Sequence, residues 1–514
     1  MQKIQTLSSH SLLFLWLGVV SGCATIDLTI PKDPSRVLES EVTANTRLGK
    51  VIELWNESHK GMSAFYPLDN GLDALGIRLG LAANAEKSLD VQTFLMKDDT
   101  ASLVMMSAFL EAADRGVRVR FLLDDIFTTA KDENLLLLSQ HPNIEIRLFN
   151  PISRKGISNL NFLGDFRSAN RRMHNKSFTV DNSVSVVGGR NIADEYFQLN
   201  VDNMFTDFDV IAAGAVAENV TSLFDEFWND QLSVPVEHVI KGPYDTTLAE
   251  VREQYQDELS RNYTNLYRQA RQSELLQRLV SEEGIYYPAE ASLLADAPDD
   301  LRKSSSNSPM QLTAQIKEVL EGAQSEVVLI TPYFVPGKDG VALLRKLVDS
   351  GVSVKLITNS LASNNHIPVQ SAYNRYRKDV INSGVDVYEI NAFAARLIDT
   401  SEEAPETMTL HTKAVLIDRR FLFAGSLNLD PRSTQINTEM GLLIDSSDMV
   451  QGLVERLVKV LPKVTYKVVL NDKNNLEWHT INEDVLQVLH KEPHTSAWLR
   501  FKAWFMRIAP ENQM

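Results

Sequence analysis

The chain has a single cysteine, Cys23, so it cannot form a disulfide within itself. Positive charge is also scarce, because 51 lysines and arginines stand against 67 aspartates and glutamates, for a net charge of −16. Nucleic-acid binding needs a broad basic surface, so this balance argues against a nucleic-acid partner while still permitting a local basic pocket. The apolar run near the N-terminus, Leu12–Val20, is too short to span a bilayer, which takes about 20 residues.

Residues 1–22 have the layout of a secretory signal. One lysine, Lys3, precedes the apolar run, and Val-Ser-Gly leads directly into Cys23. This ending resembles a bacterial lipoprotein signal, in which the cysteine is acylated and becomes the new N-terminus. The alternatives are an uncleaved anchor or a cysteine buried in an ordinary helix. We therefore expect a protein of the bacterial cell envelope that is membrane-anchored and faces the periplasm, with residues 23–64 as a tether and leading helix.

The second half of the chain repeats the plan of the first. A length of 514 residues exceeds one ordinary core, and residues 114–125, DRGVRVRFLLDD, can be laid over residues 349–360, DSGVSVKLITNS. Helical and strand patterns alternate in both halves, which predicts the α/β class, with two similar lobes that each hold a mixed sheet covered by helices on both faces. The expected divisions are lobes at 65–235 and 310–495, a charged helical inter-lobe segment at 236–309, and an amphipathic C-terminal helix at 496–514.

Two stretches, one in each half, share one residue pattern. Each reads His, one residue, Lys, four residues, Asp, six residues, Gly, then Gly or Ser, one residue and Asn. A single His-x-Lys is common, but the full pattern is not expected twice in one chain by chance. A structural duplication without a site is the alternative. The matching residues are His174, Lys176, Asp181 and Asn191 in the first half, and His411, Lys413, Asp418, Ser426 and Asn428 in the second.

This pattern suits phosphate chemistry. On a strand, residues two apart share a face, so each histidine projects on the same side as its lysine. The glycine turn that follows lets backbone amides approach an anion, and Asn191, Ser426 and Asn428 add donors. If the lobes pack about a pseudo-twofold axis, two imidazoles flank one phosphorus. One imidazole attacks a phosphodiester to form a phosphohistidine, and the other protonates the leaving alcohol. This chemistry requires no metal and no cofactor.

The aspartate of each motif should have a different task. Asp181 and Asp418 each lie seven residues after their histidine, an odd separation, so on a regular strand they face away from it. We expect these two residues to anchor the backbone, the neighbouring lysine or the turn. The carboxylates that orient the imidazoles should come from elsewhere, and Asp207 and Glu439 are the candidates because each precedes a matching apolar strand. Asp209 is the rival to Asp207.

The paired motifs resemble the signature of the phospholipase D superfamily, and the resemblance runs from about residue 65 to the end of the second lobe. Three further stretches, Phe65–Leu68, Pro332–Pro336 and Gly425–Ser433, resemble bacterial cardiolipin synthases, and the C type in particular. The resemblance implies two phospholipase D-like α/β lobes with the active site between them.

The resemblance also implies that His174 is the nucleophile, although the residues themselves do not separate its role from that of His411. One departure is Gly189, which stands where the other half has Ser426 and removes a hydroxyl donor on that side.

The expected activity is transfer of a phosphatidyl group to form cardiolipin or a related polyglycerophospholipid. The substrates implied are phospholipids, with phosphatidylglycerol first and phosphatidylethanolamine as a second candidate. A phospholipase D that transfers the group to water is the alternative, because it would use the same residues. A nuclease fits the acidic charge and the membrane signal less well. A non-enzymatic lipid-binding scaffold would predict decayed motifs, whereas both motifs here are complete.

The C-terminal stretch Ser496–Ala509 has a broad apolar face with two tryptophans, Trp498 and Trp504, and basic residues beside it. Such a helix suits the surface of a lipid bilayer. The alternative is a terminal helix that packs on the second lobe.

Overall fold

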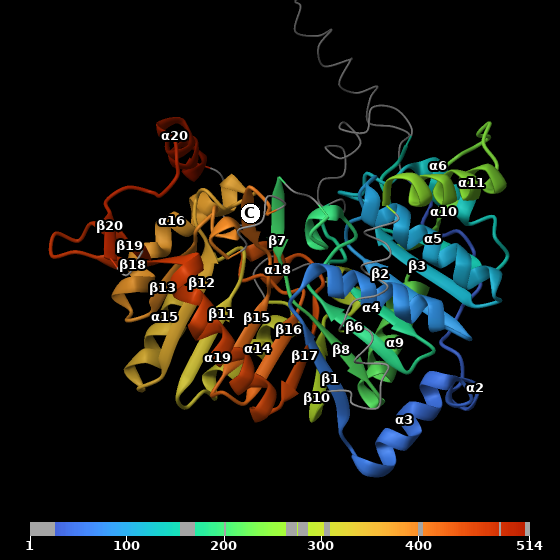
Figure 1. Cartoon of the computed structure of the whole chain (residues 1–514), viewed down its shortest axis with the longest axis horizontal. Helices are drawn as coiled ribbons and strands as arrows, with labels where there is room; N and C mark the ends of the chain where they lie inside the picture. The colour runs from blue at the N-terminus through green and yellow to red at the C-terminus, as the bar shows by residue number, and fades with distance from the viewer. Residues whose placement is uncertain are drawn as a thin grey trace, which may run out of the picture.

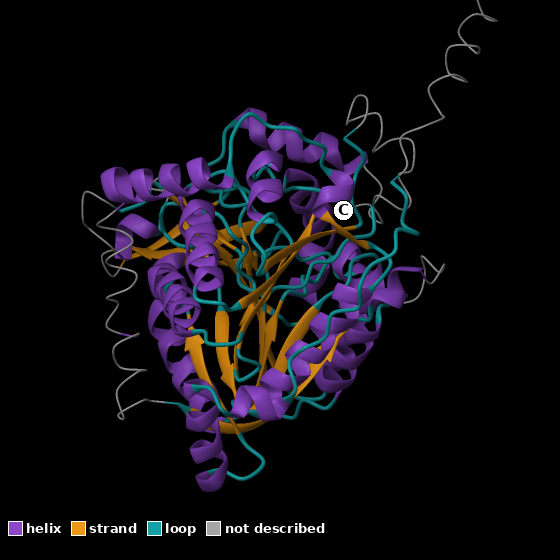
Figure 2. Cartoon of the chain, turned by 90° about the vertical axis from the view of Figure 1, so that its right-hand side faces the viewer, coloured by secondary structure: helices purple, strands orange, loops and turns teal. Residues whose placement is uncertain are grey.

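The computed structural model describes residues 26–154, 170–199, 202–263, 275, 286–302, 309–398, 404–482 and 485–508. The predicted signal and Cys23 lie outside this described part. Two lobes lie side by side, the first in blue to green and the second in yellow to red (Figure 1). Strands occupy the interior and helices cover them on the outside (Figure 2). The predicted α/β class with two similar lobes is confirmed.

The first lobe is built on a mixed sheet. Its parallel strands are β2 (Ser88–Thr93), β3 (Arg118–Asp124) and β4 (Ile144–Phe149). Antiparallel strands extend the sheet through β5 (Ser177–Val180), β6 (Val184–Gly188), β8 (Asp209–Ala213) and β1 (Ser63–Leu68), and β9 (Ser233–Pro235) flanks β4. The helices of this half are α2 (Ser40–Ala44), α3 (Arg47–Ser58), α4 (Gly71–Asn84), α5 (Thr100–Asp114), α6 (Asp132–Leu138), α9 (Ala215–Asn229), α10 (Val236–Val239) and α11 (Leu248–Glu258).

The second lobe repeats this strand order. Its parallel strands are β11 (Glu326–Ile330), β12 (Ser353–Asn359) and β13 (Asp386–Ile390). The antiparallel strands are β15 (Ala414–Ile417), β16 (Phe421–Gly425), β17 (Met440–Asp445) and β10 (Tyr287–Ala295), with β18 (Thr465–Leu470), β19 (Leu476–Asn482) and β20 (Val485–Leu489) beyond β13. Its helices are α14 (Gln311–Glu321), α15 (Gly337–Asp349), α16 (Ile367–Asn382), α17 (Ala395–Ile398), α18 (Pro431–Gln435), α19 (Ser447–Val464) and α20 (Ala497–Phe505).

The repeat extends to local geometry. After α5 the chain turns through Gly116, which has φ of +90°, and enters β3. After α15 it turns through Gly351, with φ of +93°, and enters β12. Glycine adopts this left-handed conformation without the steric cost that a side chain would add, so it ends both helices in the same way.

The segment between the lobes differs from the prediction. The sequence pattern predicts a charged helical segment at 236–309, but β10 lies within it and belongs to the second lobe's sheet. The first residues of β10, 287–289, pair with β1 and the rest, 290–295, pair with β17, so β10 joins the two sheets. The strand carries Glu290 and other exposed side chains and therefore lacks the apolar run that marks a buried strand. The second lobe thus begins before residue 310.

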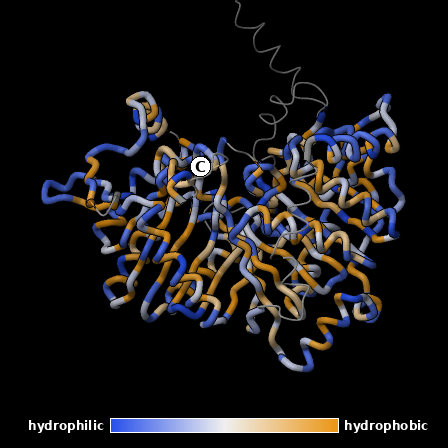
Figure 3. Tube along the Cα trace, viewed as in Figure 1, coloured by the Kyte–Doolittle hydropathy of each residue, from blue (hydrophilic) through white to orange (hydrophobic). Residues whose placement is uncertain are grey.

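The lobes share a hydrophobic core. One buried cluster fills each lobe, and a third lies where the lobes meet. The shared cluster includes Phe65 of β1, Trp228 of α9, Leu442 of β17 and Val450 of α19. Figure 3 shows the apolar residues following the interior strands. Because this cluster draws on both halves, it fixes the position of each lobe relative to the other.

Candidate active site

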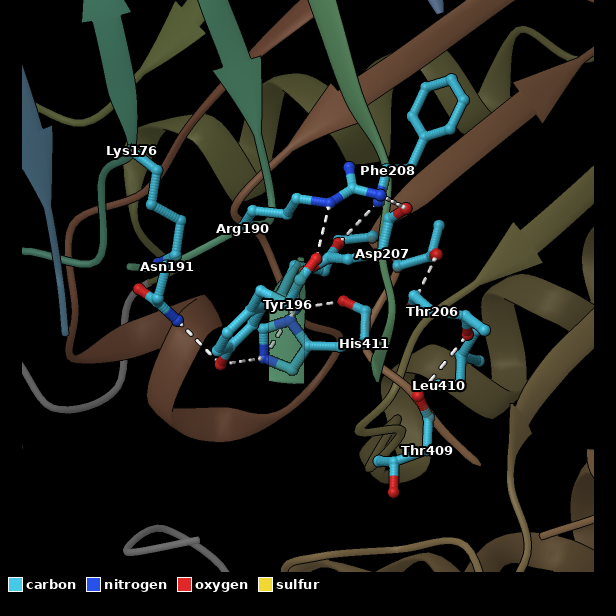
Figure 4. A network of polar contacts seen from close by, with 12 residues as sticks. Lys176, Arg190, Asn191, Tyr196, Thr206, Asp207, Phe208, Thr409, Leu410 and His411 are labelled. Atoms are coloured by element: carbon cyan, nitrogen blue, oxygen red, sulfur yellow. Dashed lines mark hydrogen bonds and ion pairs between the residues drawn. The ribbon is translucent and has the colours of Figure 1, made fainter. Parts of the chain in front are cut away.

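A parallel pair of short strands, one from each lobe, ends one residue before His411. β7 (Asn203–Thr206) of the first lobe pairs in parallel with β14 (Thr407–Leu410) of the second, and the last pair is Thr206 with Leu410. Asp207 and His411 come next, so the shared register puts the carboxylate beside the imidazole. His411 Nδ1 lies 2.6 Å from Asp207 Oδ2 (Figure 4).

The same arrangement recurs at the other histidine. Met173 and Thr438 form a parallel bridge between the lobes, and His174 and Glu439 follow them. His174 Nδ1 lies 2.8 Å from Glu439 Oε2. Each imidazole therefore receives its carboxylate from the opposite lobe, an exchange that strand spacing within one lobe does not reveal.

Asp209, the rival to Asp207, has other partners. Its carboxylate lies 2.8 Å from Arg78 and 3.2 Å from Arg190, and all three side chains are buried. Opposite charges and backbone hydrogen bonds outweigh burial and hold the pKa of Asp209 below its usual value. The two arginines thus hold Asp209 ionised at the start of β8, two residues after Asp207.

Both motif lysines point into the site. Lys176 Nζ donates to the carbonyl of His174 at 2.6 Å, and Lys413 Nζ lies 2.9 Å from His411 Nδ1. Burial lowers the pKa of Lys176 to about 7 and that of Lys413 to about 8, although neighbouring carboxylates oppose the change. A bound phosphate would raise both pKa values again and keep the ammonium groups charged.

The environment favours neutral imidazoles. Burial lowers the pKa of His174 well below its usual 6.5, and Lys176 and Lys413 lower it further. Burial and Lys413 lower the pKa of His411 to about 3, against the opposing effect of Asp207. A neutral imidazole has a lone pair for attack on phosphorus. An incoming phosphodiester anion offsets the lysine charges, which favours protonation of one imidazole as an acid.

Aromatic rings enclose both histidines, and the sequence pattern does not identify them. The ring centroid of Phe94 lies 4.7 Å from that of His174, edge to face. Phe205 stacks on His411, and Tyr196 meets it edge to face. The Tyr196 hydroxyl lies 3.5 Å from His411 Nε2 and accepts a hydrogen bond from Asn191 (Figure 4). His174 and His411 are only 7% and 5% exposed, and such low exposure to solvent strengthens the electrostatic interactions of the site.

The positions of the two carboxylates explain why one motif has Gly189 where the other has Ser426. Ser426 Oγ donates to Glu439 Oε2 at 2.5 Å. At Gly189, an added Cβ would lie 2.2 Å from Asp207 Oδ1. Asp207 therefore occupies the space that the serine side chain takes in the other half, so this position has to be glycine.

The two motif asparagines are also buried, Asn191 at 2% exposure and Asn428 at 5%. Among the described residues, neither amide oxygen has a hydrogen-bond partner. Buried polar groups are almost always paired, so these two unpaired oxygens are acceptors that could take a hydrogen bond from a hydroxyl of the substrate.

Asp181 and Asp418 lie away from the imidazoles, in the orientation that strand alternation predicts. Asp181 accepts the backbone N–H groups of Glu86, Lys87 and Ser88. Asp418 accepts the equivalent groups of residues 324–326 in the second lobe. Both aspartates have positive φ, at 49° and 53°, and close the turn after their strand. They hold the strand that carries the motif against the start of its neighbour.

Glu439 should give the reaction a pH dependence. Burial raises the pKa of Glu439 to about 8, while Lys176 and the Ser426 hydroxyl lower it. The ionised carboxylate accepts the Nδ1 proton of His174 and leaves Nε2 free to attack, whereas the protonated carboxyl donates to Nδ1 and moves the imidazole proton to Nε2. We therefore expect kcat/KM to rise as the pH rises through about 8.

Initial rates between pH 6 and 9.5 would measure this rise. Ser426→Ala removes a donor that favours the ionised carboxylate, so it should move the rise to higher pH. Ser350→Ala, at an exposed helix end, should leave it in place. A rate that falls across this range, or an unmoved rise in Ser426→Ala, would contradict the role of Glu439.

Comparisons with known proteins identify the family of the chain. The model of the family described as "Cardiolipin synthase, PLD-like domain" matches residues 79–228 and 316–460, one match in each lobe. Cardiolipin synthase C of Escherichia coli (strain K12) is 35% identical over 470 residues, which cover 90% of this chain and 98% of that protein. Cardiolipin synthase A of Pseudomonas syringae pv. syringae (strain B728a) is 26% identical over 74% of this chain and 65% of that protein.

The fold has a solved counterpart. The crystal structure of a phosphatidylserine synthase from Haemophilus influenzae aligns with a TM-score of 0.54 at 15% identity, and the alignment covers 80% of this chain and 91% of that chain. The family match spans both lobes, and the relative from Escherichia coli matches over nearly its whole length. The chain therefore belongs to the cardiolipin synthase family of phospholipase D-like proteins.

Proposed function

We propose that this chain is a phosphatidyltransferase that forms cardiolipin, or a related polyglycerophospholipid, through a phosphohistidine intermediate. The observation that carries the proposal is the pair of buried imidazoles, each with its Nδ1 on a carboxylate from the opposite lobe. Similarity to a cardiolipin synthase over 90% of the chain supports the same reaction. The proposed substrates are phosphatidylglycerol and, as a second candidate donor, phosphatidylethanolamine.

In the first step, His174 Nε2 attacks the phosphorus of one phospholipid, and the bond from phosphorus to the headgroup oxygen breaks. His411 gives its Nε2 proton to that oxygen, so the headgroup leaves as a neutral alcohol. In the second step, neutral His411 takes the proton from a glycerol hydroxyl of a second lipid. The freed oxygen attacks phosphorus, and the bond to His174 breaks. Lys176, Lys413 and the two motif asparagines stabilise charge on the non-bridging oxygens in both steps.

We also propose that the protein acts from a membrane of the bacterial cell envelope, held there as a lipoprotein through Cys23 and facing the periplasm. The support for this anchor is the N-terminal pattern of a charged start, a short apolar run and Val-Ser-Gly before the cysteine. Within the described ranges, no helix combines the length and the apolar character needed to cross a bilayer.

Expression in bacteria that make no cardiolipin tests the proposal. We expect cardiolipin to appear in the lipid extract, measured by mass spectrometry, and to be absent when an equal amount of the His174→Ala chain is expressed. A membrane-located protein that yields phosphatidic acid and no cardiolipin would indicate the hydrolase instead, because water would then be the acceptor. Lipids unchanged by an intact protein would refute both activities.

A further inference from the structure

The exposed aromatic side chains of the molecule gather on one edge. Within the part of the chain that the structure describes, the exposed phenylalanines and tryptophans are Phe127, Phe393, Trp498, Phe501, Trp504 and Phe505. Exposed apolar side chains elsewhere, such as Val51 and Leu54 on α3, are aliphatic. Soluble surfaces rarely collect aromatic rings in this way, so the gathering indicates a surface that contacts something.

In the first lobe this edge borders the active site. Phe94 follows β2, and its ring lies against His174. Phe127 follows β3, packs edge to face on Phe94 with centroids 5.7 Å apart, and is 54% exposed. β2 and β3 are parallel, so the loops that follow them leave the sheet at the same edge. The ring of Phe94 therefore lies between His174 and the exposed ring of Phe127.

The second lobe continues the edge. β11, β12 and β13 are parallel, so the loops after them also leave the sheet together. Asn359 at the end of β12 bonds to both backbone groups of Leu410, the residue before His411. Phe393 follows β13 and is 42% exposed. The Tyr333 hydroxyl, after β11, donates to Asn365 Oδ1 at 2.7 Å.

α20 sits at this edge. The carbonyl of Ala503 accepts a hydrogen bond from Ser371 of α16 at 2.6 Å, and His494, just before α20, packs on Phe393. The helix projects from the second lobe at the upper left of Figure 1. An open apolar cavity of about 530 Å³ lies between α20 and the start of α16. Its lining includes His366, Ile367, Pro368, Trp498, Phe501 and Phe505.

The positive charge of α20 indicates which kind of surface the helix contacts. Residues 497–508 contain Arg500, Lys502 and Arg507 and no acidic residue, in a chain whose net charge is −16. Trp498 and Trp504 are 61% and 60% exposed on the same short helix. Exposed indoles beside cations suit the headgroup region of an anionic bilayer. A second copy of the chain fits less well, because a symmetric contact would bring two cationic helices together.

We propose that this aromatic edge docks on a bilayer of anionic phospholipid, with α20 lying in the interface and the catalytic site open toward the headgroups. Lipid can then enter the site from the membrane with its acyl chains still in apolar surroundings, and the cavity beside α20 receives part of a chain. The proposal rests on the proposed function, since it names the surface from which that site takes its substrate.

Quenching of tryptophan fluorescence tests the contact. The full chain, with Trp16→Phe to remove the indole of the predicted signal, would be reconstituted on vesicles of phosphatidylglycerol and phosphatidylethanolamine with brominated acyl chains. We expect strong quenching that mostly disappears when Trp498→Phe/Trp504→Phe is added. Trp228 and Trp478 are buried, and Trp55 of α3 donates its indole N–H to the carbonyl of Met62, away from the aromatic edge. Equal quenching of both proteins would overturn the proposal. So would unquenched indoles together with a dimer in solution, which would assign this face to a second copy.

Activity on two substrates separates docking from catalysis. Trp504→Glu/Ile508→Glu, at exposed positions outside the lining of the cavity beside α20, should lower transfer between lipids in vesicles by about tenfold or more and leave transfer between short-chain, monomeric phospholipids unchanged. Val51→Glu/Leu54→Glu, at equally exposed positions on α3, should change neither rate. Equal loss on both substrates, or no loss on vesicles, would refute docking. If the native chain turns over neither substrate, the proposed function fails instead.

Discussion

His411→Ala should form a covalent phosphatidyl adduct from a substrate with a p-nitrophenol leaving group and then stop, whereas His174→Ala should form none. The activated phenolate needs no proton to leave, so attack by His174 does not depend on His411. The acceptor alcohol that attacks the phosphohistidine does need a base. Turnover with natural lipids should therefore fall by about 10²–10⁴-fold in His411→Ala. Loss of the nucleophile should cost at least about 10⁴-fold. Release of p-nitrophenol and intact-protein mass spectrometry measure the two outcomes.

His238→Ala provides the control, because His238 is exposed on α10 and should leave both measurements unchanged. An adduct in His174→Ala that is absent from His411→Ala would exchange the two roles. Turnover close to that of the native chain in either variant would exclude a shared site. Circular dichroism of each variant would separate loss of chemistry from loss of fold.

Asp181→Ala should destabilise the protein without removing the chemistry of the molecules that remain folded. Its buried carboxylate accepts three backbone N–H groups that would lose this partner, so we expect a loss of about 3–5 kcal/mol in the free energy of unfolding. Asp418 is partly exposed, and water can replace its bonds, so Asp418→Ala should cost about 1–2 kcal/mol. Urea unfolding of the full chain measures both values.

Asp181→Asn keeps one acceptor oxygen, so its free energy of unfolding should lie between those of the native chain and Asp181→Ala. It provides a folded variant if Asp181→Ala fails to fold. Activity per folded molecule should stay within a few-fold of native in these variants, because neither aspartate touches the imidazoles. A fully stable but inactive Asp181→Asn would place this residue in the chemistry and contradict its anchoring role.

The sequence predicts the site better than the connections that build it. Spacing within a strand is local, so it correctly separates His174 and Lys176, which face the site, from Asp181, which faces away. It cannot tell which carboxylate serves which imidazole, because that depends on the parallel contacts between lobes at β7 and β14. The contact between Asp207 of the first lobe and His411 of the second is visible only in the folded structure.

Two other features were missed for a similar reason. β10 has a weak apolar pattern because its main task is to join two sheets, and its backbone pairing does not depend on buried side chains. Tyr196 lies in a short turn with no periodic pattern, and its importance comes from the approach of His411 from the other half of the chain. Both features depend on contacts between residues that are far apart in sequence.

The exchange of carboxylates has a consequence for how such a chain can arise and change. A single lobe holds an imidazole without the acid that orients it, so one lobe alone is only a fragment of a catalyst. Two identical copies would supply each other's missing group, and fusing them into one gene would preserve both pairs. After fusion, neither lobe can be lost, and the parallel pairing between the lobes cannot shift by a residue. Each histidine depends on a carboxylate encoded more than 200 positions away.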